Sequence, residues 1–429
     1  MSNKILLYSI NYAPELTGIG KYNAEMVEWL TKNGYEVRVI TAPPYYPEWK
    51  VRQGYSAFKY IKENVGGAQV FRCPLWIPRS PSGLKRLLHL ASFALSSIPV
   101  VIKQMFWKPH LILVIEPPLA ISPMALLFSK IFNVKSWLHV QDLEVDAAFD
   151  LGILPNKEAV SSIVRNIERW MMKKFTIVSS ISESMNDRIA NKGISRDMIR
   201  LFPNWVVVSD IFPMKEIPQG YRNQLGIKEY DFVVLYSGNM GEKQGLEYLL
   251  EAANLLKERP NIKFIMCGDG ASKTRLVKMA EQYRLEHVYF LPLQPKDMLN
   301  ELLNTADTHA LIQKKSASDL VMPSKLTGML ASGRSIIATA DANTAVHSVI
   351  TQANAGLVVP AEDVSSLANA ILNLSDDKVG RQTYGENARD YAVNCLSIEN
   401  IMKDFVKDYK SFIGFTPVTN NGVKAQGHS

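Results

Sequence analysis

The sequence predicts an α/β protein of two Rossmann-like domains, in which two doubly wound parallel sheets face each other across a cleft. Its 429 residues are about three times the length of a typical single domain. Short, continuous apolar runs alternate with segments of helical spacing, as expected for parallel sheets covered on both faces. This alternation stops near residue 205 and then begins again, so two similar domains are the most economical interpretation.

In the first half, a strand, a glycine loop and a helix follow one another. Lys4–Ile10 is a β-favouring apolar run, Thr17–Gly20 contains a turn-forming Gly-Ile-Gly, and Tyr22–Leu30 has apolar groups at helical spacing. Further buried strands are expected at Glu36–Thr41, Leu111–Ile115, Lys135–Val140 and Thr176–Ser180. These elements predict a first domain over residues 1–205.

The second half repeats the order and predicts a second domain over residues 206–397, with a linker near Val206–Tyr221. A loop at Gly238–Gly245 precedes a helix at Leu246–Leu256. Strands are expected at Phe232–Ser237, Ile262–Cys267, Val288–Leu291, Thr308–Ile312 and Ser335–Thr339. We expect a last helix over 398–413 to return to the first domain, and residues 414–429 to form a flexible tail.

Composition excludes several classes of protein. Hydrophobic residues make up 47% and charged residues 21%, which excludes disorder, collagen and a disulfide scaffold. The 48 Lys and Arg exceed the 41 Asp and Glu by seven, a mild excess that suits nucleic acid, anionic lipid or a phosphorylated small molecule equally. Three widely spaced cysteines and a start without signal-peptide features predict a cytoplasmic protein.

One segment departs from the domain pattern. Leu87–Ile102 carries no formal charge, but it falls short of the ~20 apolar residues that span a bilayer. A helix over 84–102 has an apolar face that includes Leu88 and Leu95, with Lys85 and Arg86 at its start. Its polar face holds Lys85, His89, Ser92 and Ser96. Two interpretations stay open, a helix lying in a membrane interface and a core helix of the first domain.

The first glycine loop is a candidate ligand site. Gly18 and Gly20 follow the first strand, so the backbone there can approach an anion that the next helix N-terminus attracts. A tight turn without a ligand is the alternative. A dinucleotide would also need an acidic residue after the second strand, which instead ends in Thr41-Ala42. A nicotinamide cofactor is therefore disfavoured, and the sequence has no P-loop motif.

The second domain offers two cationic loops. Gly238 and Asn239 precede Lys243, which can supply a point charge for a phosphate, although an exposed surface lysine is the alternative. Ser324 and Lys325 stand just before a predicted helix, where Ser324 can cap the helix and Lys325 can reach an anion. Two such loops in one domain suggest a diphosphate ligand.

Metal chemistry is not indicated. The sequence contains no Asp-x-Asp, and its seven histidines are scattered, so no metal site is predicted. His139, Asp142 and Glu144 lie at the end of a central strand, where an enzyme of this architecture places polar groups. For His139 a buried histidine with satisfied ring nitrogens is the alternative.

Several segments together resemble a known family. They are Gly18-Ile19-Gly20, Phe202-Pro203-Asn204, Ser237-Gly238-Asn239 with Glu242-Lys243-Gln244-Gly245, and Pro323-Ser324-Lys325 with Ala331-Ser332-Gly333. The chain resembles the retaining glycosyltransferases often called family 4, which have the GT-B fold. Asn11–Tyr22, Val39–Pro47, Arg86–Leu90 and Gln141–Asp146 are similar to the colanic-acid biosynthesis fucosyltransferase branch. The resemblance extends to about residue 412.

The resemblance implies a metal-independent hexosyltransferase that needs no cofactor beyond its nucleotide-sugar donor. The second domain would bind the donor and the first domain the acceptor. Donor contacts would come from Gly18, Gly20, Gly238, Asn239, Lys243, Gly268, Ser324 and Lys325. Lys243 would neutralise the leaving diphosphate, whose stabilisation becomes a major catalytic contribution when no metal takes part.

Three departures from the family pattern affect these roles. Asn239 stands where many relatives have arginine, and Gln141 stands where they have histidine or arginine, which leaves His139 as a substitute. The second of the family's paired glutamates falls at Gly328, and Asp319 is an approximate substitute for the first. The candidate catalytic residues are therefore His139, Asp142, Lys243 and Asp319.

The leading hypothesis is transfer of a sugar, fucose from GDP-fucose, with retention onto a polyprenyl-diphosphate-linked oligosaccharide in exopolysaccharide synthesis. Such an acceptor predicts a peripheral protein on the inner face of the cytoplasmic membrane, with Lys85, Arg86, Leu88 and Leu95 as membrane contacts and no nucleic-acid partner. Two alternatives stay open: a nucleotide-sugar 2-epimerase of the same architecture, and a non-catalytic nucleotide-sugar-binding subunit of a polysaccharide assembly.

Overall fold

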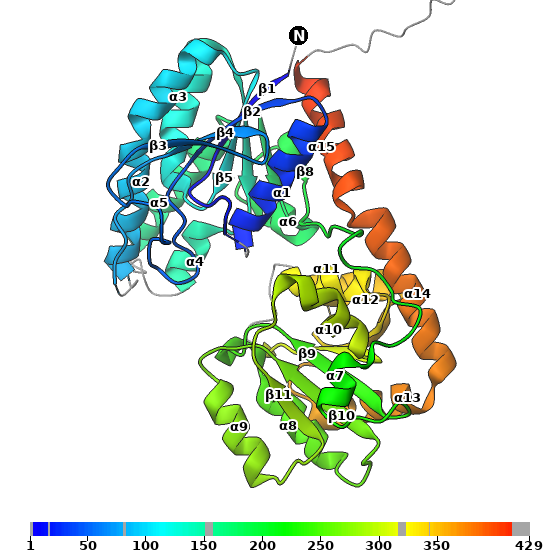
Figure 1. Cartoon of the computed structure of the whole chain (residues 1–429). Helices are drawn as coiled ribbons and strands as arrows, with labels where there is room; N and C mark the ends of the chain where they lie inside the picture. Colours follow the sequence, from blue (N-terminus) through cyan, green and yellow to red (C-terminus); the bar gives the residue numbers. More distant parts are fainter. Residues whose placement is uncertain are drawn as a thin grey trace, which may run out of the picture.

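The computed structural model describes residues 3–15, 18–79, 83–150, 158–315, 323–342 and 344–413. The chain forms two α/β units, one above the other in Figure 1, each built on its own sheet. The first sheet has eight strands in the order β3-β4-β2-β1-β5-β6-β7-β8, and the second has six in the order β11-β10-β9-β12-β13-β14. The predicted fold class is confirmed.

The first sheet is parallel except for its edge strand β3, which pairs antiparallel with β4. Its strands are β1 (Lys4–Tyr8), β2 (Glu36–Thr41), β3 (Ile61–Val65), β4 (Ala68–Arg72), β5 (Leu111–Glu116), β6 (Lys135–Val140), β7 (Ile177–Ser180) and β8 (Ile199–Leu201). Its helices are α1 (Gly18–Lys32), α2 (Gly83–Gln104), α3 (Ser122–Phe132), α4 (Glu144–Asp150), α5 (Glu158–Met172) and α6 (Glu183–Asn191).

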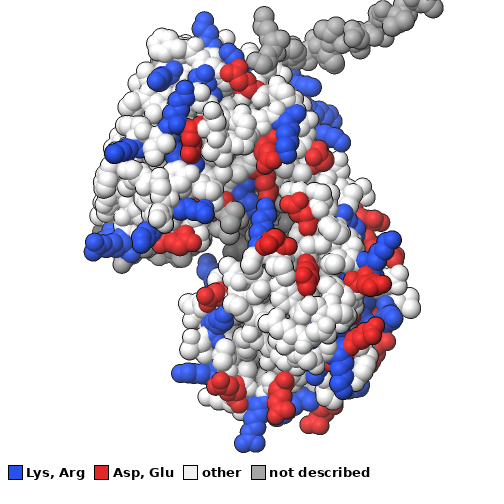
Figure 2. All heavy atoms as spheres, viewed as in Figure 1, with Lys and Arg blue, Asp and Glu red and all other residues white. Residues whose placement is uncertain are grey.

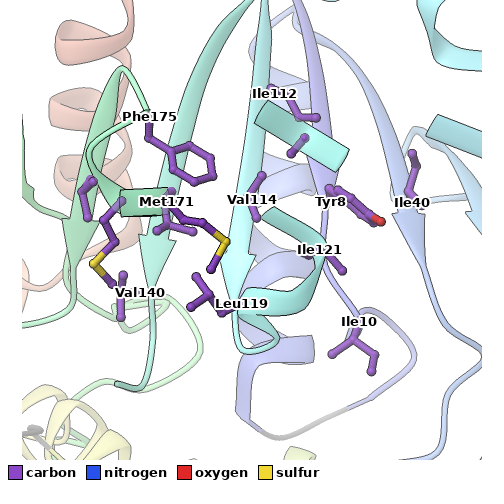
Figure 3. Close-up of a cluster of buried hydrophobic side chains, with 14 of the residues drawn as sticks. Tyr8, Ile10, Ile40, Ile112, Val114, Leu119, Ile121, Val140, Met171 and Phe175 are labelled. Atoms are coloured by element: carbon purple, nitrogen blue, oxygen red, sulfur yellow. The ribbon is translucent and has the colours of Figure 1, made fainter. Parts of the chain in front are cut away.

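Helices cover both faces of this sheet. On one face, side chains from α2, α3, α5 and α6 pack on β1, β5 and β6 in one apolar cluster, part of which Figure 3 shows around Tyr8, Val114 and Ile121. On the other face, α1 packs together with the last helix, α15 (Ile398–Ile413). The last helix therefore lies on the first sheet, although about two hundred residues of the second unit precede it in the chain.

The second sheet is entirely parallel. Its strands are β9 (Phe232–Ser237), β10 (Ile262–Cys267), β11 (Val288–Leu291), β12 (Thr308–Leu311), β13 (Ser335–Thr339) and β14 (Gly356–Val359). Its helices are α7 (Gln219–Gln224), α8 (Leu246–Leu255), α9 (Lys273–Gln282), α10 (Leu299–Thr305), α11 (Ser324–Ala331), α12 (Ala345–Ala353), α13 (Val364–Asp376) and α14 (Lys378–Cys395). One apolar cluster fills each face of the sheet.

Contacts join the two units where the chain passes from one to the other. Val206 pairs in parallel with Ser397, so the segment that enters the second unit lies beside the segment that leaves it. The Trp29 indole donates to Glu399 over 2.8 Å, which fixes the start of α15 to α1. Across the gap between the units, the Tyr22 side chain of α1 lies close to Thr327 of α11. The first turn of α1 and the first turns of α11 therefore face each other.

Helix α2 differs from the expected arrangement in one respect. Its polar face, which an interfacial helix would turn toward headgroups, points into the protein: Ser92 Oγ accepts from Trp76 N, His89 Nδ1 contacts Trp76 O at 2.6 Å, and Ser96 Oγ donates to Pro74 O. The apolar face points outward, with Leu88 and Leu95 exposed. By length and composition alone α2 could cross a membrane, but one such helix is weak evidence, and a third of its apolar window is buried.

Candidate active site

Glycine loops meet at the carboxyl ends of the central strands of the second sheet. Gly238 follows β9 and Gly268 follows β10, with φ angles of +139° and +150° that L side chains rarely adopt. A Cβ on Gly268 would overlap the carbonyl oxygen of Gly238, so the two loops can touch only because Gly268 lacks a side chain. Bare backbone at strand ends is what a phosphate group needs for close approach.

Lys325 lies directly beside this loop pair. Its Nζ stands 4.2 Å from the centroid of the Tyr236 ring, and a Cβ on Gly238 would meet its Cδ at 3.5 Å. The ammonium is buried and has no hydrogen-bond partner among the described residues. Burial lowers the pKa of Lys325 to about 7. A buried, unpaired cation is costly, and an anion placed against it would remove that cost.

Helix α11 adds a second attraction for an anion. Its N-cap is Pro323, which makes no side-chain cap bond, and Ser324 is the first helical residue. The prediction that Ser324 caps the helix was therefore wrong; its carbonyl instead accepts from Thr327 Oγ1. Without a cap, N–H groups of the first turn are available to a ligand close to the Lys325 ammonium.

The other predicted donor residues lie around the same loops. Asn239 is exposed, and its Oδ1 borders Gly270, where a Cβ would meet it at 2.7 Å. Lys243 lies in the short 3-10 turn Glu242–Gln244 with its side chain exposed, and its carbonyl accepts from Lys314 N. Asp319 lies outside the described residues.

The first unit presents its own glycine segment to the cleft. The sequence predicted Gly18 and Gly20 in a loop between the first strand and the first helix. In the structure both glycines lie in the first turn of α1. A Cβ on Gly20 would stand 2.6 Å from Glu15 Oε2, so the glycine allows a buried carboxylate to pack under the helix start. Tyr22 lies close to Thr327, two residues after Lys325, so this turn approaches the start of α11.

Two buried charges that the sequence did not single out hold the loops around this turn. Glu15 Oε1 accepts the backbone N–H groups of Tyr45 and Tyr46, both over 3.1 Å. Arg72 donates to the carbonyls of Ala13 and Ala42. The loop after β1 and the loop after β2 are thus fixed to each other by side chains from distant positions, a link that no local sequence pattern indicates.

His139 is the centre of a buried hydrogen-bond chain. Its Nδ1 lies 2.9 Å from Ser179 Oγ and its Nε2 lies 3.0 Å from the amide nitrogen of Gln141. Gln141 and Asn204 in turn exchange two amide hydrogen bonds. Burial lowers the pKa of His139 to about 3, so the ring is neutral at any physiological pH. The geometry favours a positioning role for His139, because neither ring nitrogen is free for a substrate.

Carboxylates gather at the ends of β5 and β6. Glu116 is fully buried, and neither of its oxygens has a hydrogen-bond partner among the described residues. Burial first, and then the charges of Glu144 and Glu168, raise the pKa of Glu116 well above its usual range. Asp142 is exposed beside this group, and Glu144 accepts from Leu119 N. The described residues contain no cluster of three or more His, Cys, Asp or Glu that could hold a metal ion.

Figure 2 shows a notch between the two units. Two parallel-sheet domains, with glycine loops at the strand ends of the second, are the architecture expected of a GT-B glycosyltransferase.

Sequence comparisons agree with this class. Residues 17–205 match the model of glycosyl transferase 4-like domains, and residues 219–391 match that of group 1 glycosyl transferases. WcaI of Escherichia coli K12, a glycosyl transferase assigned to colanic acid biosynthesis, is 42% identical over 411 residues, which cover 95% of this chain and all of WcaI. The chain belongs to this family of glycosyltransferases.

Solved structures show the same fold at low identity. Sucrose-phosphate synthase from Thermosynechococcus elongatus superposes with a TM-score of 0.74 at 18% identity, covering 96% of this chain and 99% of its own. Anabaena HepE in complex with UDP gives a TM-score of 0.69 at 14% identity, covering 95% of this chain and all of its own.

Proposed function

We propose that this glycosyltransferase moves a sugar from a nucleoside-diphosphate donor, without a metal ion and with retention of configuration, onto a lipid-linked oligosaccharide. By its resemblance to the colanic-acid branch, we further propose fucose from GDP-fucose as the transferred group and a colanic-acid-like exopolysaccharide as the pathway. The observation that carries the proposal is the buried, unpaired Lys325 ammonium beside the Gly238 and Gly268 loops.

The second unit is the proposed donor site. As the bond between the sugar and the diphosphate breaks, negative charge develops on the leaving phosphate. Lys325, the free N–H groups at the start of α11 and the backbone of the Gly238 loop are placed to stabilise that charge without rearrangement. Lys243, exposed on the neighbouring turn, can close on the diphosphate from the solvent side.

The first unit is the proposed acceptor site. The buried Glu15 and Arg72 shape the loops after β1 and β2, which border the cleft at the first turn of α1. We propose that His139 acts through Gln141 and Asn204 by fixing the end of β6, and that the exposed Asp142 is the group there that faces the acceptor. A lipid-linked acceptor also requires a membrane surface. We therefore propose a peripheral position on the inner face of the cytoplasmic membrane, with α2 contributing Lys85, Arg86, Leu88 and Leu95.

The comparisons support this proposal in two ways. WcaI is similar over its whole length, so both domains of this chain have a counterpart in a protein assigned to colanic acid biosynthesis. HepE shares the fold and was solved with UDP, which is consistent with a nucleoside-diphosphate donor for this chain.

A panel of nucleotide sugars, tested for protection against thermal unfolding, tests the donor part. A donor that binds the native state raises its stability by mass action, about 2.7 kcal/mol at a hundred times its Kd. We expect protection by GDP-fucose, its loss in Lys325→Ala, and its retention in Lys278→Ala, which removes an exposed lysine of α9.

Turnover separates the proposal from its alternatives. We expect transfer of labelled sugar to a lipid extract, with most of the rate lost in Lys243→Ala. Conversion of the free nucleotide sugar to its C2 epimer without any acceptor would identify an epimerase instead. Normal donor binding with no turnover in any lipid extract would favour the non-catalytic subunit.

A further inference from the structure

Exposed large apolar side chains are concentrated on three helices of the first unit. Helix α2 exposes Leu84, Leu88, Leu95 and Ile102, α3 exposes Leu127, Ile131 and Phe132, and α5 exposes Ile163, Ile167 and Trp170. Scattered exposed leucines are ordinary on a soluble protein, but a contiguous apolar surface marks an interaction site. Only the α2 part of this surface is used by the proposed function.

The three helices lie on the same face of the sheet. Their inner side chains, among them Phe93 of α2, Phe128 of α3 and Met172 of α5, enter the same apolar cluster. Helix α2 packs directly against α3, and all three lie on the left flank of the upper domain in Figure 1. Because their inner faces share one core, their outer faces point in one direction.

Each helix contributes an ordered stripe of apolar groups. Ile163, Ile167 and Trp170 follow the spacing of one face of α5, and Leu127 and Ile131 are one turn apart on α3. On α2 the polar face is hydrogen-bonded inward, so that the apolar stripe is what remains outside. A soluble core would demand the opposite orientation.

The charges around this surface are cationic. Helices α2 and α3 contain no Asp or Glu, and α5 contains only Glu158 and Glu168, of which Glu168 is buried against Lys192. The exposed charged residues on or next to the three helices include Lys85, Arg86, Lys103, Lys130, Arg165, Arg169, Lys173 and Lys174. In Figure 2 this flank is largely white, with Lys and Arg spread along it and, at its lower end, next to a smaller group of Asp and Glu.

We propose that α2, α3 and α5 together form a platform that lies on an anionic lipid bilayer, with their apolar stripes among the acyl chains and their cations among the headgroups. Apolar side chains on one helix face with flanking cations and an indole are the features of an interfacial binding surface. This deepens the proposed function, because it replaces a single membrane-contacting helix with a surface of three helices.

Binding through the platform would also fix how the cleft is oriented relative to the membrane. His89 of α2 packs edge-on against Tyr45, with ring centroids 4.8 Å apart. Arg86, at the start of α2, acts electrostatically on Tyr45 and on Glu144, one of the carboxylates near the end of β5. The membrane-facing end of α2 thus adjoins the acceptor side of the cleft. A diphosphate carried by a lipid in the bilayer would meet Arg86 as it enters.

Vesicle flotation of the full chain, with no donor or acceptor, tests the platform. We expect binding to phosphatidylcholine vesicles that contain phosphatidylglycerol, and weak binding to phosphatidylcholine alone. Ile167→Ser/Trp170→Ser on α5 should lower the partition coefficient at least about tenfold, since two large groups leave the lipid phase. The matched control Leu255→Ser/Leu293→Ser, which removes two exposed leucines of the second unit, should bind as wild type does.

The outcomes separate this proposal from the proposed function. Thermal protection by donor should be unchanged in the α5 variant, which shows that the variant is folded. Equal vesicle binding by wild type and the α5 variant would overturn the platform, as would absence of binding to anionic vesicles. A dimer in solution that the α5 variant converts to monomer would also overturn it and would assign the face to a second copy of the chain.

Discussion

Lys325 gives the sharpest prediction, because its burial sets the pH dependence of donor binding. In the free protein the pKa of Lys325 is lowered to about 7, whereas a bound diphosphate favours the charged amine and raises that pKa again. Binding above pH 7 therefore requires uptake of a proton. From a free-state pKa of about 7, the apparent Kd should rise roughly fiftyfold between about pH 7 and about pH 9, and about 0.9 proton should be taken up at about pH 8.

Isothermal titration calorimetry with GDP, in two buffers of different ionisation enthalpy, measures this uptake directly. Lys325→Ala should bind weakly at every pH and show no proton uptake, because the titrating group is gone. Lys243→Ala is the informative control: it should weaken binding while the proton uptake remains, since that lysine is exposed. A flat Kd between about pH 7 and about pH 9, with no proton uptake in the wild-type protein, would refute the reasoning.

Three further predictions concern groups around the cleft. Gly268→Ala should abolish thermal protection by the donor, since the new Cβ would overlap the Gly238 carbonyl oxygen. The control Gly226→Ala is also at positive φ but has open space around it, so it should cost only about 1 kcal/mol of stability and keep donor binding. Asn204→Ala should cost about 1–3 kcal/mol in denaturant unfolding, because it leaves a buried amide unpaired; a loss no larger than that of the exposed Asn166→Ala would contradict the network. Glu116→Gln should have a higher melting temperature than wild type, by a margin that grows with pH. Above about pH 4.5 the folded wild-type protein keeps the Glu116 carboxyl protonated while the unfolded chain loses that proton, so wild-type stability falls as pH rises toward the raised pKa. A pH-independent difference between the two proteins would contradict that account.

The sequence predicted the central strands closely because they are buried on both faces. Glu36–Thr41, Phe232–Ser237 and Ile262–Cys267 are found with the bounds expected from their apolar runs. The edge strand β3 was missed, since Ile61–Val65 contains three polar residues and faces solvent on one side. Gly18 was expected in a loop but begins α1, because glycine is equally compatible with a helix start and a turn.

Residues of the candidate site could be predicted from the sequence only where their role depends on neighbours in the chain. Lys325 was found as a cation near a helix start, but its burial depends on Tyr236, which lies on a strand about ninety residues earlier. The state of His139 depends on Ser179, forty residues away, and on Gln141. Glu116 ends an apolar strand and gave no signal, since its neighbours Glu144 and Glu168 join it only in the folded chain. The inward polar face of α2 likewise depends on carbonyls of the loop after β4.

The central claim, transfer of sugar from a nucleotide donor to a lipid-linked acceptor, is tested most directly by one measurement. The purified full chain is incubated with radiolabelled GDP-fucose and a membrane lipid extract, and the lipid phase is analysed for label and for the anomeric configuration of the attached sugar. We expect label in the lipid phase with the donor's anomeric configuration, and its absence with Lys325→Ala. Label that stays entirely in the aqueous phase, for this donor and for every other nucleotide sugar that protects the protein, would contradict the account.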